Sequence, residues 1–192
     1  KPQQLEEPAD NGITYEIDGF LRFPETGLYS LLLSYTEFAE LLGKAGFIDS
    51  VYYSLNNIAD GEKYTIFMPS AEAIENSEVD TMTRAELEQL IKYHIIKGDI
   101  IFTDGRKPSN DYATLRIDES STVYQTRYSP LNINTGPDVI NILNEDGSLY
   151  YRVEESEGET NIMFSEDIDP DNQSTNYVTK GVVHVIDTLL VR

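Results

Sequence analysis

Residues 180–191 read KGVVHVIDTLLV and contain the most apolar β-prone run of the chain. Apolar side chains fall on both faces of this run if it is extended, because successive side chains of a strand alternate between its faces. A strand with two apolar faces has to be covered on both sides. We therefore predict a central, buried strand over Val182 to Val191.

A second β-prone run stands at residues 64–74, which read YTIFMPSAEAI. Tyr64 to Met68 has the length and composition of a strand, and Pro69 ends it because proline cannot donate a backbone hydrogen bond. Ser70 is suited to cap a following helix over residues 71–76. The run predicts a strand, a stop and a capped helix.

Two segments have helical periodicity. Residues 28–42 repeat leucine and aromatic residues every three or four positions, which predicts one amphipathic helix, or two helices broken near Ser34. Thr83 and Glu86 form a T-x-x-E capping box that predicts a helix over 84–91. We expect a short helical turn at Phe47-Ile48 and Val51-Tyr52.

Beyond these helices the chain turns to β character, first at Tyr93 to Ile96. Short strand-like runs separated by turn residues then recur. They are Ile100 to Thr103, Ala113 to Ile117, Thr122 to Thr126, Asn132 to Asn134, Val139 to Leu143 and Leu149 to Val153. Helices followed by many strands predict an α+β fold with segregated N-terminal helices.

Composition narrows the class of partner. The 192 residues carry 14 Lys plus Arg against 34 Asp plus Glu, a formal charge of −20, which opposes binding to nucleic acid or to anionic membranes. The chain has no cysteine, which excludes disulfides and thiolate chemistry. No apolar run approaches the ~20 residues that a transmembrane segment needs, and no secretory signal opens the chain.

The order of three motifs resembles the fasciclin domain. These motifs are the strand and turn at 64–74, YHIIKG at 93–98 and KGVVHVIDTLLV at 180–191, and the similarity covers about residues 25–192. The sequence departs from the family pattern at Lys180, where asparagine is usual, and in the long acidic stretch from Tyr151 to Asn176. The resemblance implies a fasciclin-like β-sandwich core.

The resemblance also implies a function. Members of the family are adhesion modules, so we expect a non-catalytic, extracytoplasmic binding module at the cell surface or in the periplasm, such as part of a bacterial surface lipoprotein. Its partner would be a surface or matrix protein or a glycan. Tyr93 and His94 match the Tyr-His element implicated in binding by some members, although the apolar neighbours of this pair also suit a buried strand.

Residues 12–21, GITYEIDGFL, align without gaps on residues 181–190, GVVHVIDTLL. Chance could produce such a match between short apolar strands, but we favour a repeat. Fasciclin-like domains often occur in tandem. We therefore divide the chain into residues 1–24, the possible tail of a preceding repeat, and a domain over 25–192.

Catalytic and metal chemistry has weak support in the sequence. His94 and His184 lie in apolar runs, which favours hydrogen-bonded core histidines. Asp167, Asp169 and Asp171 alternate as in the first half of a calcium loop, but the turn glycine and the closing glutamate are missing, which favours a solvated acidic loop. We predict no catalytic residue, metal or cofactor. Two alternatives remain, a structural spacer and a carbohydrate-active enzyme with two convergent carboxylates.

Overall fold

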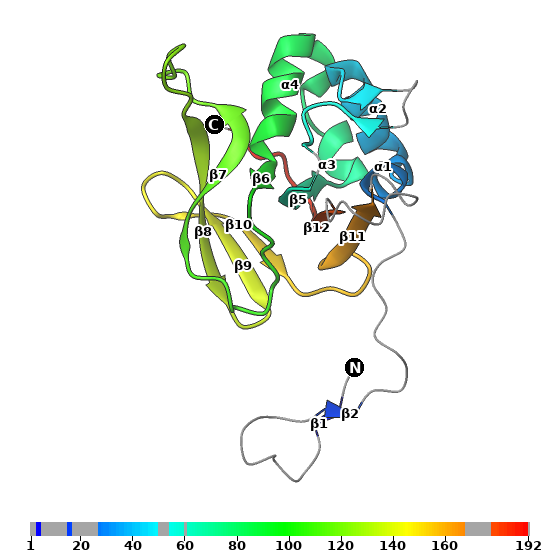
Figure 1. The fold of residues 1–192 in the computed structure, drawn as a ribbon, viewed down its shortest axis with the longest axis vertical. Coiled ribbons are helices and arrows are strands. Elements are labelled where there is room, and N and C mark those ends of the chain that lie inside the picture. Colours follow the sequence, from blue (N-terminus) through cyan, green and yellow to red (C-terminus); the bar gives the residue numbers. More distant parts are fainter. Residues whose placement is uncertain are drawn as a thin grey trace.

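A computed structural model describes residues 3–4, 15–16, 27–49, 54–59, 61–167 and 178–191. Eight strands form one sheet in the order β10-β9-β8-β7-β6-β5-β12-β11 (Figure 1). Their bounds are β5 Lys63–Pro69, β6 Ile95–Lys97, β7 Asn110–Ile117, β8 Tyr128–Gly136, β9 Val139–Leu143, β10 Leu149–Glu154, β11 Ile162–Asp167 and β12 Val178–Ile186.

Four α-helices and two short strand pairs complete the described structure. The helices are α1 Leu28–Leu33, α2 Thr36–Ala45, α3 Ala71–Glu75 and α4 Arg84–Tyr93, with a single 3-10 turn, η1, at Val79–Thr81. The pairs are β1 Gln3–Gln4 with β2 Tyr15–Glu16, and β3 Ile48–Asp49 with β4 Ser54–Leu55.

The two strands of the signature motifs, β5 and β12, lie side by side in the sheet. The prediction that the second one is central is wrong, because only β11 separates β12 from the edge, whereas its burial is confirmed. β12 runs parallel to β5 over seven residue pairs, from Lys180 with Lys63 to Ile186 with Pro69. Gly181 faces Tyr64, and a Cβ atom at Gly181 would collide with the Tyr64 carbonyl oxygen and the Phe164 ring. The glycine is therefore needed for close approach of the two backbones.

β5 and β12 have an apolar core on each face. Tyr64, Ile66 and Met68 belong to a core shared with helices α1, α2 and α4, whereas Phe67 and Ile186 belong to a second core. That second core takes its other members mainly from β7 to β10, which shows that the sheet curls back over β5 and β12. Figure 1 shows the helices and β7 to β10 on opposite sides of β5 and β12.

The local signals for helix and strand are largely confirmed. The helix over 28–42 is broken at Ser34, and Gly46 ends α2 in the left-handed conformation at a φ of 79°. Ser70 caps α3, accepting a hydrogen bond from the Ala73 amide at 3.2 Å. Thr83 and Glu86 make both hydrogen bonds of the capping box.

Several predicted β segments are wrong. Tyr93 is the last residue of α4 and His94 is its C-cap, so the following strand begins at Ile95. Residues 100–103 form no strand, because side chains rather than a neighbouring strand hold the backbone of Ile101. Residues 122–126 form a tight turn with a bridge between Thr122 and Gln125.

Two further boundaries differ from the prediction. Phe47-Ile48 is no helical turn, because Ile48 pairs with Leu55 in a short β ladder. β12 ends at Ile186 and does not continue to Val191, since the amide of Asp187 donates to the Tyr151 hydroxyl instead of to a strand. Residues 12–14 and 17–21 of the N-terminal stretch that aligns on residues 181–190, and the predicted turn at Val51-Tyr52, lie outside the described residues.

The fold is mixed α/β with one curled sheet. The predicted two-sheet sandwich is not confirmed, because hydrogen bonds join all eight strands in a single sheet. Segregation of the helices is not confirmed either, because β3, β4 and β5 lie between α2 and α3 in the sequence.

Replacement of Gly181 by Ala is expected to lower the free energy of unfolding by about 2 to 4 kcal/mol, because the new methyl group must separate β12 from β5 or displace the Phe164 ring. Gly43→Ala is the matched control, because a Cβ atom there has no neighbour within 4 Å. In helix α2 this change should stabilise the fold by about 0.5 to 1 kcal/mol. Equal effects of the two substitutions in denaturant melts would contradict the assigned close contact.

Candidate functional site

Polar side chains of the two signature strands hold Ile101, a residue of the loop between β6 and β7. The amide of Ile101 donates to Thr65 Oγ1 at 2.9 Å, and the Ile101 carbonyl accepts from His184 Nε2 at 2.8 Å. Thr65 also donates to the Asp99 carbonyl at 2.9 Å. Thr65 on β5 and His184 on β12 therefore bind the backbone of the protein itself.

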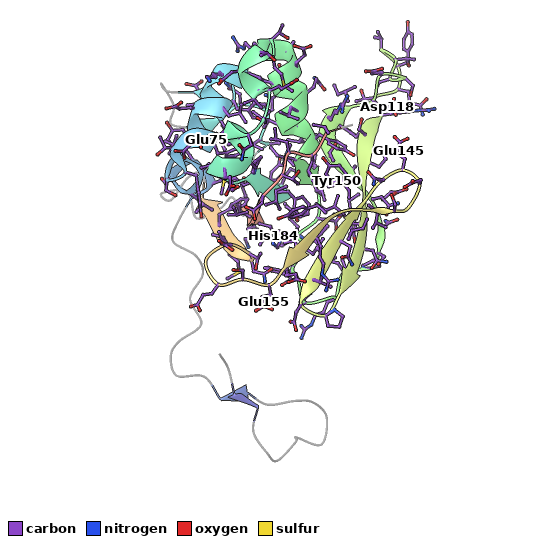
Figure 2. All side chains as sticks on the ribbon, turned by 180° about the vertical axis from the view of Figure 1, so that it is seen from behind. Glu75, Asp118, Glu145, Tyr150, Glu155 and His184 are labelled. Carbon is purple, nitrogen blue, oxygen red and sulfur yellow. The ribbon has the colours of Figure 1, made fainter. Side chains whose placement is uncertain are left out.

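His184 is fixed by its remaining contacts. Its Nδ1 accepts a hydrogen bond from the Asn161 amide at 3.4 Å, and its ring stacks on Phe67 with centroids 5.6 Å apart. The Asn161 side chain in turn donates to Thr103 Oγ1 at 2.6 Å. Figure 2 labels His184 where β12 passes through the interior. This arrangement uses both ring nitrogens of His184 and leaves neither for a ligand.

His94 secures the segment that follows β12. Its Nδ1 donates to the Leu90 carbonyl at 2.9 Å, and its Nε2 accepts from the Leu190 amide at 2.9 Å. Side chains from β10 bind the same segment: Tyr150 donates to the Leu189 carbonyl at 2.6 Å, and Tyr151 accepts from the Asp187 amide at 3.0 Å. Residues 187–191, the C-terminal segment, are thus held without strand pairing.

Both histidines are neutral in the folded protein. Burial lowers the pKa of His94 and of His184 from 6.5 to about 4, against a smaller opposing effect of the backbone carbonyl that each one faces. The hydrogen bonds agree, since each ring donates from one nitrogen and accepts at the other, which only a neutral imidazole does. The sequence-based interpretation as core histidines matches this geometry.

The structure places the two expected binding residues differently. His94 is 1% exposed and has both nitrogens occupied, so it has no atom with which to contact a partner. Tyr93 is 9% exposed, and the guanidinium of Arg116 lies over its ring at 5.6 Å. Of the pair, Tyr93 is the residue that reaches a hollow of the surface.

This hollow, of about 610 Å³, lies between β8, β9, the β9–β10 turn and the C-terminal segment. Buried apolar residues line it, and Asp111, Glu145 and Asp146 stand among its polar residues. Hydrogen bonds from Ser148 hold the pKa of Asp146 below its usual value. That shift is the reverse of what a glycosidase general acid requires.

The sequence did not indicate the most exposed apolar site. Residues 116–128, which we call the finger, comprise the end of β7, the turn that follows it and the first residue of β8, and they project from the fold (Figure 1). Val123 and Tyr124 at the tip are 97% and 99% exposed. A β-prone run such as 122–126 predicts a strand, and nothing in it distinguishes a buried pair from an exposed one.

Among the described residues, no group of three or more His, Asp or Glu side chains could hold a metal ion. Residues 168–177, which include two of the three alternating aspartates, lie outside the described part of the chain. The calcium alternative therefore stays a hypothesis. No helix within the described ranges is long and apolar enough to span a membrane.

The chain forms a mixed α/β domain in which the two signature strands run parallel within one curled sheet. The buried histidines of the motifs make hydrogen bonds to the backbone of the domain itself. A comparison with protein-family models matches the Fasciclin domain over residues 33–192. The chain therefore belongs to the fasciclin domain family. A search of curated proteins found no match. Fasciclin domains are generally non-catalytic adhesion or binding modules.

Acid should destabilise the protein through the two histidines. Each has a pKa near 4 when folded and near 6.5 when unfolded, so the unfolded chain binds more protons between these values. The stability that each neutral histidine contributes is complete above about pH 6.5 and falls by up to about 1.4 kcal/mol per pH unit as the pH drops toward 4.

Denaturant melts from pH 7.5 to pH 4 test this expectation. His94→Gln and His184→Gln each remove one titrating group while keeping a donor and an acceptor. Each variant should lose less stability on acidification than the parent does, and the contribution of the carboxylates cancels in the comparison. Parallel pH profiles for parent and variants would show that the histidines are not the groups protonated on unfolding.

Proposed function

We propose that this chain is a non-catalytic adhesion or binding module that acts outside the cytoplasm, at a cell surface or in the periplasm, as part of a surface lipoprotein. Its partner would be a surface or matrix protein or a glycan. Membership of the fasciclin family supports this class of function. The acidic surface is compatible with such a partner and unfavourable for nucleic acid.

The observation that carries the proposal is the distribution of exposed apolar side chains. Of the eight large apolar residues that are exposed in the described structure, four belong to the finger: Ile117, Val123, Tyr124 and Tyr128. The signature residues, in contrast, are hydrogen-bonded to the chain's own backbone. Binding is therefore better sought in the loops than in the motifs.

The two alternatives have less support. A structural spacer needs no concentrated exposed aromatic residues, and Tyr124 and Tyr128 share one finger. A carbohydrate-active enzyme needs a carboxyl group kept protonated near neutral pH, whereas the pKa of Asp146 at the hollow is lowered. We retain the binding module as the proposal.

Within the Tyr-His pair we propose a division of roles. Tyr93 lines the hollow and supplies a contact to the partner. His94 positions the C-terminal segment, which forms another wall of that hollow through Leu190 and Val191. His94 would thus influence binding through the segment it holds rather than by contact.

For residues 1–24 we propose a segment outside the domain, the tail of a preceding fasciclin-like repeat. The family match begins at residue 33, which supports a domain that does not need the first 24 residues. A tandem arrangement suits adhesion, because linked weak sites gain from their high effective concentration.

Tyr93→Phe is expected to weaken attachment several-fold, because it keeps the ring of a residue that lines the hollow and removes its hydroxyl. Beads coated with the protein would be tested on surfaces carrying matrix proteins or a panel of glycans. Tyr112→Phe is the matched control, since its hydroxyl donates to the Pro108 carbonyl at 2.6 Å and Tyr112 is not among the residues that line the hollow. Absence of saturable attachment by the parent on every surface would favour the spacer.

A further inference from the structure

The finger is a braced structure rather than a loose loop. Thr122 and Gln125 exchange two backbone hydrogen bonds of 3.1 Å across the tip. Ser121 bridges the finger, since its hydroxyl donates to the Gln125 carbonyl at 3.0 Å and accepts from the Arg127 amide at 2.9 Å. A preorganised tip loses little conformational freedom on binding.

The residues held at this tip contribute nothing visible to the fold. Val123 and Tyr124 are almost fully exposed, although each could bury a large apolar area. Burial of such side chains in a pocket is the usual source of binding energy at a protein interface. The bracing thus presents two apolar anchors to a partner.

The charge of the finger sets it apart from the rest of the surface. Arg116 and Arg127 balance Asp118 and Glu119, so residues 116–128 sum to 2 − 2 = 0 in a chain of charge −20. Arg127 contacts Gln125 Oε1 at 3.4 Å and forms no ion pair with a carboxylate of the described residues. A fitting partner would offer an apolar pocket with carboxylates around it.

The hollow described above has these properties. Its floor includes the buried residues Leu131, Ile142 and Leu190, and Asp111, Glu145 and Asp146 supply carboxylates. Its volume of about 610 Å³ lies within the range of sites that enclose several side chains or a small ligand. The apolar tip of the finger suits the apolar floor of the hollow, and Arg127 suits the carboxylates of the hollow. The same chain therefore carries both of these complementary surfaces.

The finger and the hollow are also neighbours. Arg116 and Glu119, at the base of the finger, line a second depression that shares Leu190 and Val191 with the hollow. In Figure 2, Asp118 at the finger and Glu145 at the β9–β10 turn lie on the same side of the molecule. Two copies facing each other could therefore each receive the finger of the other in a closed two-fold pair.

We propose that the finger of one copy of this chain inserts Val123 and Tyr124 into the hollow of a second copy, so that the domain pairs with itself. The inference rests on the proposed binding function and names its partner. Arg127 of one copy then approaches the carboxylates of the other. Because two chains of charge −20 repel each other overall, a finger of zero net charge favours approach at this place.

Sedimentation velocity of the full chain tests the pairing, at about 0.15 M salt to screen the long-range repulsion. The parent should form dimers as its concentration rises through the micromolar range. The double variant Val123→Ser, Tyr124→Ser should have a dimer dissociation constant at least tenfold higher than that of the parent. The matched control Leu149→Ser, Met163→Ser removes two exposed apolar residues elsewhere and should pair as the parent does.

A complementation experiment separates finger from hollow. The variant Asn132→Trp fills the hollow and leaves the finger intact. If this variant melts at a lower temperature than the parent, Asp111→Trp is used as the filled variant in its place. The finger variant and the filled variant should each stay monomeric, whereas their equimolar mixture should form a one-to-one pair, because one intact finger meets one open hollow. A mixture that stays monomeric, or a finger variant that pairs like the parent, overturns the proposal.

A parent that stays monomeric at every concentration also overturns self-pairing. The bead assay on matrix and glycan surfaces then decides the wider question independently. Saturable attachment there would leave the proposed binding function standing with a different partner, and its absence would remove both.

Discussion

The backbone of Ile101 is the point on which the two signature strands converge. Thr65 on β5 accepts from its amide, and His184 on β12 donates to its carbonyl. Both strands lie in the interior. Loss of either hydrogen bond would leave a buried backbone group without a partner, which would lower the free energy of unfolding by about 1 to 3 kcal/mol. The contact holds the loop from β6 to β7 against β5 and β12, and the sheet curls from this pair over its second core.

This constraint explains why the family motifs say little about the partner. The polar side-chain atoms of Thr65, His94 and His184 form hydrogen bonds with the chain's own backbone. Gly181 allows β5 and β12 to approach each other closely. These requirements define the domain. The finger and the hollow lie outside the motif residues Thr65, Gly181 and His184, so these motif residues do not specify the surfaces that a partner could contact.

The sequence predicted elements wherever a local signal was sufficient. Capping at Ser70 and Thr83 and the apolar run at 64–68 fixed α3, α4 and β5, because these depend on neighbouring residues. The end of β12 at Ile186 could not be predicted, since two tyrosines that are 36 and 39 residues away in the sequence from their partners bind the backbone beyond it. For the same reason, nothing local distinguished the exposed turn at Val123 and Tyr124 from a buried strand.

Amide hydrogen exchange at Ile101 tests the central contact most directly. In the parent this amide should exchange nearly as slowly as the amides of β5, which open only when the whole domain unfolds. Thr65→Val keeps the shape of the side chain but removes the acceptor, and should speed exchange at Ile101 at least tenfold more than within β5; Thr126→Val, on the exposed finger, should leave it unchanged. Rapid exchange at Ile101 in the parent, or an unchanged rate in Thr65→Val, would contradict the account.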